Sequence, residues 1–145
     1  MMDVIWGIVV VVLAALAWGG QTLSWLAPPA AVRWGLREAD SEVDPVYAAD
    51  IEGEAMWDAF TLWTLLAAGV LLLVDHRTWP YFGLVGGGMY VYFAGRGIAT
   101  RVVMRSRGHR VGSESSLTTA LTALVIWGLA GLVTIVVAII ELRGR

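Results

Sequence analysis

Three acidic side chains are spaced so that they share one face of a predicted helix. Asp50, Glu54 and Asp58 follow one another at intervals of four residues, which is close to one turn of an α-helix. A row of carboxylates of this kind can hold a cation or pair with basic side chains. The stretch after the next turn supplies cations at comparable spacing, namely Arg96, Arg101 and Arg105. The candidate chemistry of this chain is therefore concentrated in one charged hairpin.

Counting outward from the turn near Arg77 predicts which charges meet. Asp58 precedes that centre by 19 residues and Arg96 follows it by 19, so two straight antiparallel helices would place them side by side. The same counting pairs Glu54 with Arg101 and Asp50 with Arg105. A charge inside an apolar helix costs about 2.5 kcal/mol or more on insertion scales, so we expect Arg96 to face protein and to be paired.

Two interpretations of the charged hairpin remain open from the sequence. In the first, the pairs are structural and fix the register of the two helices. In the second, they form a polar site near the membrane surface that binds a headgroup, an ion or a substrate, because ionisable groups inside membranes are functional candidates. Arginine suits bidentate contact with phosphate, so an unpaired arginine here would fit an anionic lipid. Tyr92 and the deeper aromatic residues Trp18, Trp63, Tyr90 and Trp127 would line such a site or simply pack.

Composition excludes several other chemistries. The chain has no cysteine and no lysine, so disulfides, thiolate metal sites and Schiff-base chemistry are ruled out. Its two histidines, His76 and His109, stand in polar connecting stretches. No Glu-x-x-His pair occurs, so a di-iron carboxylate bundle has no support, and we expect neither a metal nor a cofactor. The net charge of −2 gives no reason to expect a nucleic-acid partner.

The elements that position these charges are predicted to be membrane helices. Hydrophobic residues make up 58% of the chain and charged residues 15%, against about 25% charged in soluble domains. Apolar runs of about 20 residues are long enough to span a bilayer as helices. Four are found, at about 4–26, 55–74, 79–103 and 117–142. We therefore expect an all-α membrane protein, a bundle of four transmembrane helices forming one domain over residues 1–145. The first run follows Asp3 rather than a basic segment and is too long for a signal peptide.

The distribution of arginine predicts the orientation. Six arginines flank the first and third connections, whereas three flank the turn and the C-terminal end. Basic residues favour the cytoplasmic side. We therefore expect both of these connections in the cytoplasm and both termini outside, in a plasma or inner membrane.

A glycine face on the third run bears on what the protein does. Gly83, Gly87 and Gly95 recur at four-residue multiples, and small residues let membrane helices pack closely. With no evident nucleophile, this favours a non-catalytic subunit or scaffold that contacts a second copy or another membrane protein, although the sequence leaves enzymatic activity undecided. The alternative is a protein that binds a lipid or another small ligand, or acts on a lipid, through a site around Asp58 and Arg96.

Overall fold

The computed structural model describes residues 2–144, and within them regular structure is helical apart from one isolated bridge. In chain order the elements are α1 (Met2–Leu26), α2 (Pro28–Arg33), the 3-10 turn η1 (Asp40–Glu42), α3 (Pro45–Thr61), α4 (Trp63–Leu73), α5 (Trp79–Ser106) and α6 (Glu114–Arg143). The expectation of an all-α protein is confirmed for this part of the chain.

Three helical stretches in the described residues are long and apolar enough to cross a membrane. They are Asp3–Leu26, the continuous path Pro45–Leu73 and Glu114–Arg143. The prediction of four spans is thus supported for the first, second and fourth. The third predicted span is α5, which folds as a helix of 28 residues but is not apolar enough to qualify. Arg96, Arg101 and Arg105, which suggested the charged hairpin, are all in its second half and lower its hydropathy.

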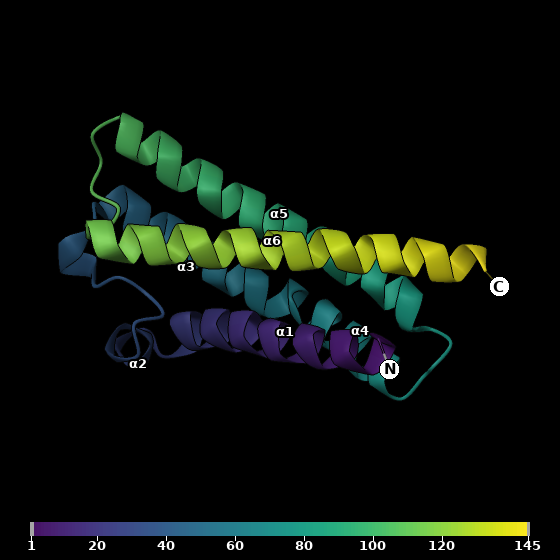
Figure 1. The fold of residues 1–145 in the computed structure, drawn as a ribbon. Coiled ribbons are helices and arrows are strands. Elements are labelled where there is room, and N and C mark those ends of the chain that lie inside the picture. The colour runs from purple at the N-terminus through teal and green to yellow at the C-terminus, as the bar shows by residue number, and fades with distance from the viewer. Residues whose placement is uncertain (1, 145) are drawn as a thin grey trace.

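The long helices pack in the spatial order α1, α4, α5, α6. Figure 1 shows both ends of the described chain at the same end of the molecule, with the first and third connections at the other. Helix α4 packs between α1 and α5, and α5 packs in turn against α6. Helix α3 diverges from α5 and lies mainly against α1. As a result α1 and α6, at the two outer positions, make little direct contact.

The path from α3 to α4 is interrupted at Leu62. Nearby carbonyl groups accept hydrogen bonds from side chains: the indole of Trp18 donates to Ala59 O, and the hydroxyl of Thr64 to Thr61 O. Side-chain donors of this kind satisfy backbone groups that a helix break leaves exposed in a membrane. Gly86 of α5 lies against the break, because a Cβ there would come within 2.5 Å of Leu65 N.

Close contact between α5 and α6 depends on glycine. A Cβ added to Gly87 would lie 2.7 Å from Gly131 O, and one added to Gly131 would lie 2.7 Å from Gly87 O. Gly83 meets Ala138 in the same interface. Gly95, predicted to continue this face, does not belong to it, since a Cβ there would meet nothing within 4 Å. The glycines of α5 therefore contact α6 of the same chain. On α6 the contact includes Gly131, which the sequence did not indicate.

The first and third connections are joined to each other. Val43 and Val111 form the isolated antiparallel bridge, and Asp44 N donates to Arg110 O. A small apolar cluster forms beneath this junction, containing Val43, Tyr47, Ile51, Val111 and Leu117. The junction holds the start of α3 and the start of α6 together, and it thereby positions the polar residues at this end of the molecule.

Candidate functional site

Arg96 is the centre of the charged hairpin. Its Nη2 lies 2.6 Å from Oδ1 of Asp50 and forms a hydrogen bond with it, and its Nη1 lies 2.9 Å from Oε1 of Glu54. The side chain of Glu54 is only 8% exposed, whereas those of Arg96 and Asp50 are about one-third exposed. One guanidinium group therefore holds two carboxylates of the predicted row.

This pairing corrects the register predicted from the sequence. Arg96 contacts Asp50 and Glu54 instead of Asp58, so the salt bridge lies one to two helical turns further from the hairpin turn than expected on the acidic helix. Counting residues from the turn identifies neighbours at the same membrane depth only when the two antiparallel helices are straight and do not diverge. Helix α3 diverges from α5, so residues counted equally from the turn do not meet at this end of the hairpin.

Asp58 is left without a salt bridge to an arginine. The residue is 4% exposed, and its Oδ2 atom has no hydrogen-bond partner within the described part of the chain. It remains close enough to Arg96 and Glu54 for their charges to act on it. The predicted row of three carboxylates is thus real, but its innermost member is the one that lacks a direct partner.

The two remaining arginines of the prediction also have different partners from those expected. Arg101 donates from Nη1 to the carbonyl of Gly97 and lies over the ring of Tyr47, with its Cζ 5.8 Å from the ring centroid. Its buried Nε has no hydrogen-bond partner in residues 2–144. Arg105 pairs with Glu114 at the start of α6, where both side chains are more than half exposed. The predicted pairs Glu54–Arg101 and Asp50–Arg105 are therefore not formed.

A pocket of about 650 Å³ adjoins this cluster. It lies between α1, α5, α6 and the connection that follows α2, and it exists because α1 and α6 are held apart by the helices between them. Glu54 and Arg101 line it, so the charged hairpin and the pocket share these two side chains. The volume lies within the range of about 300–1,000 Å³ that is typical of small-molecule sites.

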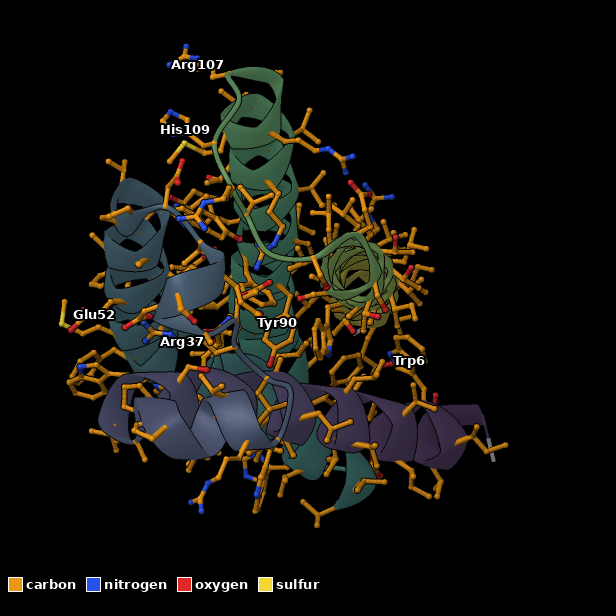
Figure 2. All side chains as sticks on the ribbon, turned by 90° about the vertical axis from the view of Figure 1, so that its left-hand side faces the viewer. Trp6, Arg37, Glu52, Tyr90, Arg107 and His109 are labelled. Carbon is orange, nitrogen blue, oxygen red and sulfur yellow. The ribbon has the colours of Figure 1, made fainter. Side chains whose placement is uncertain are left out.

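The wall of the pocket is polar toward the connections. Arg37, whose side chain is 5% exposed, donates to Ser24 O and pairs with Asp40. Ser116 donates a hydrogen bond of 3.1 Å to Oε1 of Glu38. Figure 2, viewed from the connection end, shows Arg37 among the helices, whereas Glu52 lies on the outer side of α3 and Arg107 at the periphery. The sequence analysis placed Arg37 only by its charge and did not predict that it would be buried.

Part of the pocket lining is apolar. It is formed by side chains of α1, α5 and α6, namely Leu16, Ala17, Phe93, Ala120, Ala123, Leu124 and Trp127. Trp127 donates its indole N–H to Leu13 O at 2.9 Å, which places α6 across the gap from α1. A pocket with one charged and one apolar wall matches a ligand that has a polar end and a hydrocarbon end.

The aromatic residues proposed from the sequence are distributed differently. Tyr92 is 59% exposed and does not line this pocket. Tyr90 is buried, donates to Ala14 O at 3.1 Å and belongs to the main apolar core. Among the aromatic candidates it is Trp127 that lines the pocket. A helix turns by about 100° per residue, so residues two positions apart face nearly opposite sides. This explains why Tyr90 is buried in the core while Tyr92 is exposed.

Asp44 connects the two loops beyond the pocket. Its carboxylate accepts hydrogen bonds from Arg110 N and Arg110 Nε and lies 3.0 Å from Nδ1 of His109. These interactions, with that of His109 first, lower the pKa of Asp44 below its ordinary value of 3.8. Asp44 stands at the N-cap of α3 before Pro45, but its side chain makes no capping hydrogen bond. It is used to hold the third connection instead.

Comparison with known protein families, with curated proteins and with solved structures finds no match for this chain. Its function is therefore inferred from the geometry of the site.

The pocket brings hydroxyl groups next to carboxylates. Nucleophilic catalysis needs a base within hydrogen-bond reach of the nucleophile, and Ser116 donates to Glu38 in this lining. No group of three or more potential metal ligands occurs in residues 2–144. The pocket offers two arginines, three glutamates, several hydroxyl groups and apolar side chains.

Proposed function

We propose that this protein is an integral membrane protein that binds a phospholipid-like amphiphile in the pocket between α1, α5 and α6. The observation that carries the proposal is the division of the pocket into a polar wall with Arg101 and an apolar wall with Trp127. The headgroup oxygens would accept hydrogen bonds from Arg101, and the acyl chains would lie along the apolar wall toward the bilayer.

Arg101 is the residue that favours an acceptor-rich headgroup. Arg37 and Arg96 already form salt bridges with carboxylates, whereas the Nε of Arg101 is buried without a partner among the described residues. Arg101 forms no salt bridge of that kind within the described residues and lines the pocket, so its guanidinium would donate to a headgroup oxygen. Arginine also contacts phosphate more specifically than a point charge does.

The proposal places the protein in the bilayer in a defined way. We infer that α5 crosses together with the three apolar helices, since Arg96 is paired with carboxylates and does not enter the membrane as an unpaired charge. The first and third connections would face the cytoplasm, where the excess of arginine places them, and the pocket would open near that surface of a plasma or inner membrane.

A scaffold or subunit function was the main expectation from the glycine face. That face is occupied by α6 of the same chain, through Gly83, Gly87 and Gly131. The feature that suggested an oligomer or a partner membrane protein therefore has an explanation within one chain, and the pocket becomes the stronger basis for a function.

Native mass spectrometry of the intact protein tests the proposal. The protein is purified in mild detergent and then mixed with phospholipid in a fixed molar excess. We expect one phospholipid to remain bound to the wild type, and Ala123→Trp to lose it because the indole fills the pocket. Val125→Trp is the matched control, since Val125 is exposed on the same helix and does not line the pocket. Equal retention by all three proteins would contradict the proposal.

The contact between Arg101 and the headgroup is tested by comparing two arginine variants. Arg101→Leu should weaken retention, whereas Arg105→Leu should not, because Arg105 pairs with Glu114 at an exposed position outside this pocket. Equal loss in both variants would mean that positive charge in general attracts the lipid and that Arg101 has no specific contact with it.

A further inference from the structure

The innermost carboxyl group of the acidic row has no function in the proposed lipid site. Asp58 does not line the pocket, and it lies one helical turn inside the apolar run that begins at Ala55. At 4% exposure it is among the few buried polar side chains of the described chain. An ionisable residue at such a depth is costly, and in membrane proteins it usually marks an ion or proton pathway.

The surroundings of Asp58 do not supply a second positive charge. Helix α3 contributes Glu54, and α5 contributes Arg96 and Tyr90. Arg96 is committed to Asp50 and Glu54, and the hydroxyl of Tyr90 donates to Ala14 O. Helix α1 has Asp3 as its one acidic or basic residue, more than ten residues from the buried stretch at Ala14 and Ala17, and α4 has none. Asp50, Glu54 and Asp58 therefore gather near the Arg96 guanidinium, and the charge of Arg101 also acts on Glu54.

Burial favours the neutral form of Asp58 over the ionised form. Isolated charges buried in apolar surroundings are so costly that the group neutralises instead. Its Oδ2 atom, which has no hydrogen-bond partner in residues 2–144, is free to carry the hydrogen. Glu54 precedes Asp58 by four residues on the same face of the helix, and it lines the pocket.

We propose that Asp58 is an internal proton-binding site and that it exchanges its proton with the pocket by way of Glu54. In this exchange a hydronium ion in the pocket gives a proton to the Glu54 carboxylate and becomes water. Glu54 then passes a proton to Asp58, whose charge changes from −1 to 0, and returns to its own carboxylate form. Binding of the proton at Asp58 does not depend on what the pocket binds, whereas its exchange through Glu54 uses the pocket.

Infrared spectroscopy of the full chain in lipid tests the binding of the proton. A protonated carboxyl group has a carbonyl stretch that is separate from the bands of carboxylates. Near pH 7, where ordinary carboxyl groups are ionised, we expect the wild type to show this band and Asp58→Asn to lose it. Glu52→Gln is the control, because Glu52 is an exposed acid on the outer side of the same helix, and it should keep the band. Absence of the band from the wild type, or its survival in Asp58→Asn, would overturn the proposal.

Isotope labelling of the wild type tests the same assignment without relying on the folding of Asp58→Asn. With ¹³C in the aspartate carboxyl groups of the wild type, the band should shift to lower frequency. An unshifted band would place the proton on a glutamate and would overturn the assignment to Asp58.

The route is tested by transfer into D₂O. We expect the Asp58 band to exchange several-fold more slowly in Glu54→Gln than in the wild type, because glutamine cannot accept and return a proton. Glu52→Gln should exchange at the wild-type rate. Unchanged exchange in Glu54→Gln would overturn the route through the pocket.

Discussion

Arg96 and Asp50 are separated by 46 residues in the chain, yet Nη2 of the arginine lies 2.6 Å from Oδ1 of the aspartate. The sequence suggested Asp58 as the partner of Arg96. The position of this salt bridge therefore reflects how α3 and α5 diverge, and the coupling between its two residues can be measured.

A double-mutant cycle should distinguish the two registers. We expect Asp50→Ala and Arg96→Ala to show a coupling free energy within the range of about 0.5–3 kcal/mol seen for residues in contact. The coupling between Asp58 and Arg96 should be smaller, because Asp58 makes no direct salt bridge. The free energy of unfolding in detergent is the quantity to measure. A larger coupling for Asp58 than for Asp50 would restore the register predicted from the sequence.

Removal of single arginines should have unequal costs. Loss of one partner of a buried ion pair typically costs about 3–5 kcal/mol, and Arg96→Leu should approach the lower end because Arg96 is 30% exposed. Arg105→Leu breaks a pair whose side chains are 51% and 79% exposed, and exposed pairs contribute only about 0–1 kcal/mol. Detergent melting curves of the two variants would check this ranking, and equal losses would contradict it.

Substitution of adjacent glycines by alanine should have opposite effects. In Gly87→Ala the new methyl group would lie 2.7 Å from the carbonyl oxygen of Gly131, and overpacking of this kind costs about 1–3 kcal/mol. Gly88→Ala meets nothing within 4 Å, so it should gain the helical preference of alanine, about 0.5–1 kcal/mol. Thermal unfolding of both variants is the measurement. Stabilisation by both would show that α6 does not contact α5 at Gly87.

The junction between the first and third connections should weaken in acid. The pKa of Asp44 is below its ordinary value in the folded protein. The ionised carboxylate therefore stabilises the fold at pH values above the pKa that Asp44 has in the unfolded chain. That contribution is lost as the pH falls through the lowered pKa. Asp44→Asn should be less stable than the wild type at neutral pH, and the difference should diminish below about pH 4. A difference that stays constant between neutral and acidic pH would show that the carboxylate charge is not responsible.

Reporter fusions measure the orientation in the membrane. Fusions after Gly112 and at the C-terminus should report opposite sides, with Gly112 in the cytoplasm, because six arginines flank the first and third connections. A cytoplasmic C-terminus together with an external Gly112 would invert the proposed orientation.

The local features of this protein could be predicted from its sequence. The apolar runs of membrane length and the polar connections between them indicated where helices would form, because these features depend on residues near one another in the chain. The four-residue spacing of Asp50, Glu54 and Asp58 placed them on one face for the same reason. Composition alone also excluded cysteine and lysine chemistry.

Only the tertiary structure decided which of these groups meet. The partner of Arg96 depends on the angle between α3 and α5 and on the break at Leu62, and neither quantity is contained in a residue count. The contact of Gly87 with Gly131 and the isolation of Asp58 likewise depend on which helix packs on which. The pocket exists because α1 and α6, about 100 residues apart in the chain, are the outer helices of the arrangement. Long-range packing of this kind is set by the summed shape of all the side chains, so no single motif could have predicted it.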